Sequence, residues 1–220
     1  FMHLKEDYMR NGQLKPAYNL QLGVSNGYIM SLGVFQERDD SGTLIPFLLN
    51  FKNQYGYYPL YPVADAGYGS LANYRFLELN GMELYLKYSM YSKEKKSNGN
   101  FIDKFIKIDD KTLICPNNKK LNLLYEKKNR KVKELKDQIY GCEDCSDCIF
   151  SKTCKKSVKN KDLNRVVRIN FEWKRYRLKV LNNLTSDIGN ELKKNRSSQV
   201  EGAFGVIKED MQYKRLTEEQ

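Results

Sequence analysis

The chain has 220 residues, enough for one or two domains with a sizeable hydrophobic core. Hydrophobic residues make up 40% of it, which excludes an intrinsically disordered chain, and no apolar run approaches the roughly 20 residues that a membrane helix needs. A net charge of +11 favours a polyanionic partner, most commonly nucleic acid, although the surface of a protein from a lysine-rich proteome would give the same balance.

The chain begins with Phe1 rather than methionine, and we therefore expect a fragment of a longer protein. No secretory signal is visible. Residues 16–36 alternate between apolar and polar positions on either side of a Ser-Asn-Gly turn, which predicts an antiparallel hairpin. A helix is expected next, over about 43–55.

A strand–helix–strand unit follows, with a buried strand over 60–64, a helix over 71–80 capped by Ser70, and a strand over 83–88. Such a unit implies a parallel pair with a right-handed crossover. Asp65 directly follows the first of these strands, where sheets of this kind carry functional groups. Gly67 and Gly69 are expected to let the backbone turn sharply beside it. The alternative is a turn or helix-cap aspartate.

Residues 92–162 are rich in Lys, Asn and Ser, with a polar linker at 93–100 and a predicted hairpin over 111–124, and we interpret them as an insertion. All five cysteines lie between residues 115 and 154. The short spacing in Cys-x2-Cys loops points two thiolates at one centre, as tetrahedral zinc requires. We expect a structural zinc site made by Cys115, Cys145, Cys148 and Cys154, with Cys142 as the rival fourth ligand. Reduced cysteines without a metal remain the alternative.

Residues 171–188 predict one long amphipathic helix that ends near Gly189, and a shorter helix follows around Glu201. Glu201 and Lys208 are seven residues apart, so both are expected on one helix face. Gly202 and Gly205 are expected to allow another backbone to approach closely. A surface Glu–Lys pair is the alternative interpretation.

The segments ADAGYGS (64–70) and RSSQVEGAFGVIK (196–208), with a cysteine-bearing insertion between them, resemble the DDE transposases of bacterial insertion sequences. The resemblance is to the subgroup with a Cys-rich insertion before the catalytic Glu. The opening residues 1–5 and 11–19 are similar to the segment before the second strand of that family. The resemblance implies an α/β fold with an RNase H-like catalytic core whose first strand is missing here. It also implies core segments over 1–91 and 163–220, interrupted by the zinc-binding insertion over 92–162.

The resemblance implies that Asp65 is the second catalytic Asp, that Glu201 is the catalytic Glu, and that Lys208 contacts DNA near the transposon end. Arg196 corresponds to the arginine of that helix signature, with one residue more before Glu201 than in the better-known version. The first catalytic Asp is expected before Phe1, because Asp7, Asp39 and Asp40 have the wrong sequence surroundings.

The activity implied is two-metal phosphoryl transfer with Mg²⁺ or Mn²⁺, which cleaves DNA at transposon ends and joins it to target DNA. We expect a cytoplasmic, nucleoid-associated protein that forms a homodimer on DNA and has no membrane partner. Two other hypotheses stay open. One is an inactive or domesticated transposase remnant that acts as a DNA-binding module, and the other is a nuclease of the same fold that cuts without joining.

Overall fold

The structure is a computed structural model, and it describes residues 18–96, 101–128, 136–156, 158, 160 and 163–211. The opening segments that contribute to the resemblance, apart from residues 18 and 19, and the end of the predicted linker at 97–100 lie outside these residues. The chain divides into two compact units. Unit 1 comprises Phe1–Ser89 and Lys179–Gln220, and unit 2 comprises Met90–Leu178.

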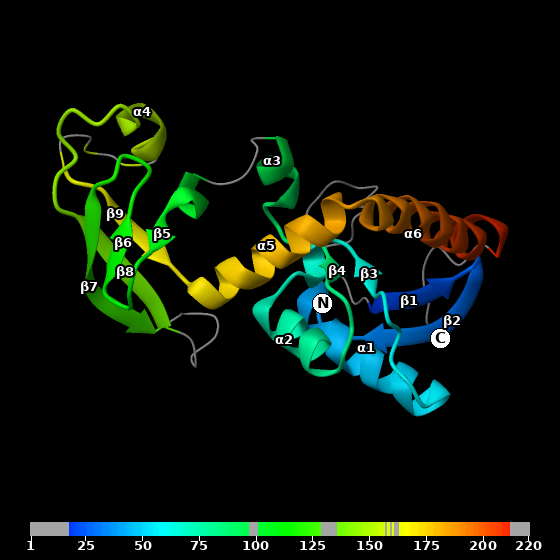
Figure 1. Cartoon of the computed structure of the whole chain (residues 1–220). Helices are drawn as coiled ribbons and strands as arrows, with labels where there is room; N and C mark the ends of the chain where they lie inside the picture. The colour runs from blue at the N-terminus through cyan, green and yellow to red at the C-terminus, as the bar shows by residue number, and fades with distance from the viewer. Residues whose placement is uncertain are drawn as a thin grey trace, which may run out of the picture. The chain divides into compact units, whose positions relative to one another are not determined.

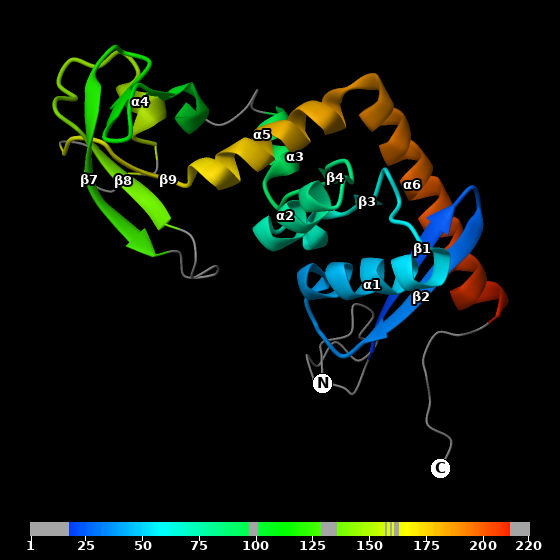
Figure 2. The same ribbon diagram turned by 60° about the horizontal axis from the view of Figure 1, so that its bottom comes forward.

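Unit 1 is a mixed α/β unit (Figures 1 and 2). Its elements in chain order are β1 (Asn19–Ser25), β2 (Tyr28–Phe35), α1 (Asp40–Tyr55), β3 (Val63–Ala64), the 3-10 turn η1 (Ala66–Tyr68), α2 (Leu71–Leu79), β4 (Tyr85–Leu86), α6 (Asp187–Gly205) and the π-helical turn η3 (Val206–Asp210). The helix α5 (Phe171–Thr185) crosses the boundary between the units.

The predicted hairpin is confirmed. Strands β1 and β2 pair antiparallel, and Asn26 and Gly27 between them both have positive φ, as the tight turn requires. Helix α1 follows, three residues longer at its start than predicted, and it contacts both strands. Gly56 ends this helix in the left-handed conformation, with its N–H bonded to the carbonyl of Lys52 at 2.7 Å.

The strand–helix–strand unit is confirmed as well, but its strands are shorter than predicted. Strands β3 and β4 have two residues each and pair parallel, Val63 with Tyr85 and Ala64 with Leu86. Helix α2 connects them, and the Ser70 hydroxyl accepts the N–H of Asn73 at 3.2 Å as its N-cap. The pair β3–β4 and the hairpin β1–β2 form two separate two-stranded sheets.

The break between the two C-terminal helices lies at Ser186, and the prediction of an end at Gly189 was wrong. Ser186 caps α6 by accepting the N–H of Gly189 at 3.1 Å, and Gly189 lies inside the helix. A Cβ at Gly189 would collide with the backbone of Asn183, so the glycine serves a close approach. The serine supplies the capping oxygen that decides where the new helix starts.

Unit 2 contains a five-stranded antiparallel sheet in the order β5-β6-β7-β8-β9 (Figure 1). Its elements are α3 (Tyr91–Lys96), the 3-10 turn η2 (Phe101–Lys104), β5 (Ile106–Lys107), β6 (Thr112–Ile114), β7 (Lys120–Lys128), β8 (Lys136–Cys142), α4 (Ser151–Cys154), β9 (Val166–Ile169) and the first part of α5. The pairing of β6 with β7 confirms the predicted hairpin over 111–124. The insertion boundaries at 92 and 162 remain a prediction, and the compact unit itself extends to Leu178.

Each unit buries its own apolar core. In unit 1 the most deeply buried side chains include Tyr74, Leu77, Leu84, Leu86 and Leu184. In unit 2 the core consists of Phe105, Leu113, Leu121, Tyr140, Cys142, Val167 and Ile169. Of the helices that the structure describes, none is both long and apolar enough to cross a membrane.

Candidate functional site

Asp65 lies directly after β3, at the strand end where it was predicted. It precedes the 3-10 turn η1, yet its side chain makes no capping hydrogen bond, and only its backbone carbonyl accepts the N–H of Tyr68, at 3.2 Å. The helix-cap interpretation therefore does not explain this carboxylate. About half of the side chain is exposed, at 47%, so that a ligand can reach it.

Two cations from distant parts of unit 1 hold the Asp65 carboxylate. The Arg196 guanidinium, from α6, lies 2.6 Å from Oδ2, and the Lys87 ammonium, just after β4, lies 3.3 Å from Oδ1. Helix α6 contacts both β1 and β3, which brings Arg196 to the strand end. Each carboxylate oxygen of Asp65 therefore already has a positively charged partner.

Asp40 belongs to the same neighbourhood. At the start of α1, its Oδ1 accepts hydrogen bonds from Asn19 at 2.8 Å and Gln21 at 3.2 Å. A Cβ on Gly67 would lie 2.8 Å from Asp40 Oδ2, so this glycine lets the Asp65 loop approach α1. Gly67 and Gly69 have no positive φ, and their role is close packing rather than the sharp turn expected from sequence.

Tyr68 connects these acids electrostatically. Burial raises the pKa of its hydroxyl, the charge of Asp40 raises it further, Arg196 opposes the increase, and Asp65 adds to it. The pKa of the Lys193 ammonium is lowered, first by burial and then by the charge of Lys87. Positive charge from α6 therefore gathers close to Lys87 and Asp65.

Glu201 lies on α6, the same helix as Arg196, and is exposed. Five residues of an α-helix correspond to a rotation of about 140° and a rise of about 7.5 Å. Arg196 faces Asp65, so Glu201 projects from a different side of the helix. A spacing of four residues would have placed the two on nearly the same face.

The end of α6 differs from the expectation in two respects. A Cβ on Gly202 or Gly205 would meet nothing within 4 Å, so these glycines do not serve a close backbone approach within the described part of the chain. Lys208 lies in the π-helical turn η3, and the α-helical argument that placed it on the face of Glu201 does not hold there. Lys208 is exposed.

The five cysteines come together in unit 2. They line one small cavity of about 20 Å³, together with Phe105, Lys119, Leu121, Asp144 and Arg165. A space of this size holds about one water-sized occupant. All five are free thiols, and Cys142 is the buried one. The four predicted ligands and the rival Cys142 therefore all line this one cavity.

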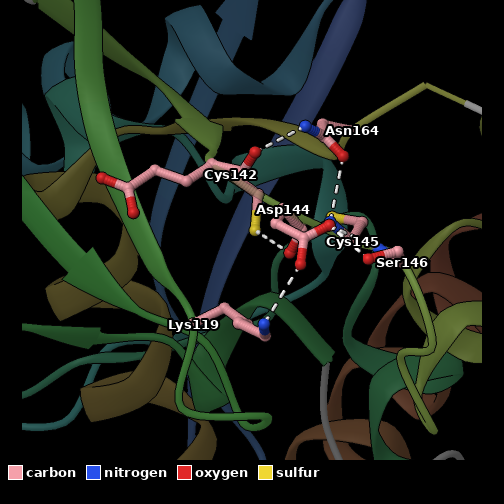
Figure 3. A network of polar contacts seen from close by, with 7 residues as sticks. Lys119, Cys142, Asp144, Cys145, Ser146 and Asn164 are labelled. Atoms are coloured by element: carbon pink, nitrogen blue, oxygen red, sulfur yellow. Dashed lines mark hydrogen bonds and ion pairs between the residues drawn. The ribbon is translucent and has the colours of Figure 1, made fainter.

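Polar contacts fix the loop that carries Cys142 and Cys145 (Figure 3). The Cys142 thiol donates to the carbonyl of Asp144 at 3.3 Å, and the Cys145 N–H donates to Asn164 Oδ1 at 3.0 Å. The Cys145 sulfur accepts the N–H of Arg165 at 3.2 Å.

The carboxylate of Asp144 completes this network. It accepts hydrogen bonds from the backbone and hydroxyl of Ser146 and pairs with Lys119 at 3.1 Å. The Ser146 hydrogen bonds, followed by that of Lys119, lower the pKa of the Asp144 carboxyl to about 2. Asp144 is therefore ionised at neutral pH beside the cysteine cavity.

Neither site forms a finished metal centre as the side chains stand. Across the ranges that the structure covers, no group of three or more His, Cys, Asp or Glu residues is arranged to hold a metal ion. The donor types nevertheless suit two different ions: the carboxylate oxygens at Asp65 suit Mg²⁺ or Mn²⁺, and the thiols suit Zn²⁺.

Sequence reasoning missed Lys87, Lys193 and Asp40 as neighbours of the site. Lys87 follows the second strand of the parallel pair as Asp65 follows the first, and this shared position was a signal that could have found it. Asp40 had no comparable signal, because its contacts come from β1, 19 and 21 residues earlier.

Comparison with known proteins finds a family match for the second half of the chain. Residues 114–219 match a family model described as a transposase DDE domain. The match includes α6 with Arg196 and Glu201, and it includes all five cysteines, but Asp65 precedes it. No curated protein and no solved structure matches the chain.

Proposed function

We propose that this chain, whose residues 114–219 match a transposase DDE domain, cleaves and joins DNA strands with Asp65 and Glu201 as catalytic carboxylates. The observation that carries the proposal is the placement of Asp65, half-exposed at the end of a parallel strand with α6, which lies in the matched region, against that strand. DNA is then the partner, as transposon ends and target, with a homodimer as the assembly on DNA.

The order of elements in unit 1 supports an RNase H-like core. An antiparallel hairpin, a helix, and a parallel strand–helix–strand unit follow one another, and α6 returns to contact β1 and β3. In this proposal the first core strand and the first catalytic Asp come before Phe1. The separate sheets β1–β2 and β3–β4 would be neighbours of that strand.

In the active enzyme Asp65 and Glu201 would hold Mg²⁺ or Mn²⁺ together with the acid expected before Phe1. This requires α6 to turn so that Glu201, and not only Arg196, faces Asp65. Bound there, the ions would activate an attacking water or 3′-hydroxyl and neutralise charge on the leaving oxygen. Arg196 and Lys87 keep the Asp65 carboxylate in place and offset its charge. Lys208 and Arg196 are the proposed DNA contacts of the family signature.

The experiment measures cleavage of a transposon-end duplex with Mg²⁺ or Mn²⁺ by the longer protein that we expect to contain this chain. We compare wild type with Asp65→Asn and Glu201→Gln, and we use Glu191→Gln, another exposed acid of α6, as the matched control. Both site variants should lose about a hundredfold to a thousandfold in rate, the order expected when a preorganised electrostatic group is removed. The control should cleave at the wild-type rate.

Cleavage that survives in Asp65→Asn or Glu201→Gln would refute the catalytic assignment. Cleavage without joining to target DNA would instead favour the nuclease of the same fold. If no variant cleaves, and salt-sensitive DNA binding is intact in all of them, the chain acts as a DNA-binding module.

We also propose that the cysteine cavity holds a structural Zn²⁺ bound by Cys115, Cys145, Cys148 and Cys154, as the Cys-rich subgroup of the resemblance suggests. All four line a cavity of single-atom size, and small χ1 rotations would have to bring their sulfurs into coordination. Cys142 lines it too, but its thiol already donates a hydrogen bond to Asp144. This contact favours Cys142 as the cysteine left over.

A further inference from the structure

Asn164 and Arg165, which lead into β9, hold the loop that carries two of the cysteines. The N–H of Cys142 donates to the Arg165 carbonyl at 2.8 Å, and the N–H of Cys145 donates to Asn164 Oδ1 at 3.0 Å. The Asn164 amide in turn donates to the Glu143 carbonyl at 2.7 Å (Figure 3). Three hydrogen bonds therefore fix this loop against the start of β9.

Arg165 also acts on the cysteine sulfurs themselves. Its backbone N–H donates to Cys145 Sγ at 3.2 Å, and its side chain lines the cavity that all five cysteines share. Burial raises the pKa of the Cys154 thiol, and the charge of Arg165 opposes this increase. The guanidinium is therefore close enough to Cys154 to favour its thiolate form.

The Arg165 side chain contains a buried donor without an acceptor. Its Nε atom is buried and has no hydrogen-bond partner among the residues that the structure describes. Such an orphaned donor is rare in proteins and costs free energy, and arginine cannot avoid the cost by losing its proton. A group that accepts a hydrogen bond inside the cavity would remove this cost.

A zinc-bound thiolate is an acceptor that fits this position. Zinc with four cysteine thiolates keeps a net negative charge, and metal ligands are commonly held by hydrogen bonds from residues that do not bind the metal. Lys119 is the other cation of the cavity lining, but it already pairs with Asp144 at 3.1 Å. Arg165 is thus the cation of the lining that suits the thiolates.

We propose that Arg165 is a positioning residue of the zinc site, with its backbone N–H on the Cys145 sulfur and its Nε donating to the Cys154 thiolate. The proposal rests on the zinc site proposed above, and it adds a residue that does not itself bind the metal. The backbone contact sets the place of one ligand. The guanidinium orients a second ligand and offsets the negative charge of the thiolates.

The test measures the zinc affinity of the 220-residue chain by competition with a chromophoric chelator. It then records the thiolate-to-metal charge-transfer band with Co²⁺ in place of zinc. The variants are Arg165→Met, Arg165→Lys and Asn164→Ala. Lys152→Met is the matched control, because Lys152 lies in α4, close in sequence to Cys148 and Cys154, but is exposed and does not line the cavity. Circular dichroism checks that every variant folds.

Arg165→Met should bind zinc about 10- to 100-fold more weakly, the order expected when a hydrogen-bond partner of a metal ligand is lost. Its charge-transfer band should move to lower energy, because a sulfur that loses a hydrogen bond holds its electrons less tightly. Arg165→Lys keeps the charge without a donor at the Nε position, so it should recover only part of the affinity. Lys152→Met should match wild type in both measurements.

Asn164→Ala separates the contact to sulfur from the general order of the loop. Asn164 bonds to backbone groups of the loop and not to a sulfur, so its loss should leave the charge-transfer band in place. A shift as large as that in Arg165→Met would show that loop disorder alone moves the band, and it would overturn the proposal.

The remaining outcomes distinguish Arg165 from the zinc site. If wild type binds zinc, and Arg165→Met has the same affinity and the same band, the role of Arg165 is refuted and the zinc site stands. Full recovery of affinity in Arg165→Lys would show that charge alone suffices, and it would refute the hydrogen bond from Nε. If wild type binds no zinc, both proposals fail, and the cleavage test at Asp65 and Glu201 is unaffected.

Discussion

Arg177 in unit 2 and Arg196 in unit 1 both pair with carboxylates, but in different surroundings. The Arg177 side chain is 7% exposed and bridges Glu94 and Asp103. The Arg196 side chain is 22% exposed, and its partner Asp65 is 47% exposed. A buried pair has no water to replace a lost partner, whereas a partly open pair can exchange its partner for a ligand.

The two candidate metal sites show the same contrast between buried and open surroundings. The cysteines enclose a cavity against the core of unit 2, and Cys115, Cys145 and Cys154 pack on that core. Asp65 stands at a strand end, and about half of its side chain is open to solvent. We therefore expect the groups of unit 2 to determine stability, and the groups around Asp65 to determine binding and chemistry.

Replacement of a proposed zinc ligand should have the largest effect. We expect Cys145→Ser to lose the bound zinc and to destabilise unit 2 by several kcal/mol, because the free energy of binding structural zinc is also folding free energy. Cys142→Ser is the matched control and should retain one zinc per chain. The measurements are zinc content by elemental analysis and urea unfolding followed by Trp173, the single tryptophan, which lies in unit 2.

Two results would contradict the zinc proposal. The first is an absence of zinc from wild-type protein purified without chelators and then supplied with Zn²⁺. The second is loss of zinc in Cys142→Ser but not in a Cys115→Ser variant. That result would identify Cys142, rather than Cys115, as the fourth zinc ligand.

Removal of the buried guanidinium should come next. Arg177→Met removes the buried guanidinium that pairs with Glu94 and Asp103, and we expect the free energy of unfolding of unit 2 to fall by about 3–5 kcal/mol. Arg175→Met, on the same helix, is the control, since Arg175 is exposed and stacks 4.2 Å from the ring of Tyr176. Its loss should cost about 1 kcal/mol or less. Equal losses would show that burial does not distinguish these arginines.

The cap of α2 should contribute a moderate amount. Ser70→Ala removes the acceptor of the Asn73 N–H and should lower the stability of unit 1 by about 1 kcal/mol. Ser70→Asp should restore most of it, because aspartate also caps helix N-termini. Urea unfolding followed by circular dichroism measures both. If the aspartate variant is as unstable as the alanine variant, the hydroxyl acts through packing rather than capping.

The open ion pair should contribute least to stability. Arg196→Gln breaks the pair with Asp65, and we expect the free energy of unfolding to change by less than about 1 kcal/mol. DNA affinity should nevertheless fall and its salt slope should decrease, because Arg196 is a proposed phosphate contact. A loss of several kcal/mol in stability, with unchanged DNA binding, would reverse the comparison and make this pair structural.

Local signals in the sequence predicted the elements near Asp65 well. The Asn26-Gly27 turn, the Ser70 cap and the apolar runs before Asp65 and Lys87 depend on neighbouring residues, and the structure contains the elements that they predict. The helix break was misplaced because a glycine inside a helix and a glycine after one look alike in sequence. Only the close approach of Asn183 distinguishes them at Gly189.

The sequence by itself determined the residue types: a carboxylate after a parallel strand, an Arg–Glu–Lys segment on a helix, and clustered cysteines. The tertiary structure decided which of them meet. Arg196 reaches Asp65 because α6 packs on β3, and Cys115 joins the other cysteines because its hairpin extends the sheet that carries Cys142. These contacts join positions 27 and 131 residues apart. The cysteine composition predicted the first, whereas no local pattern predicted that Arg196 would face Asp65.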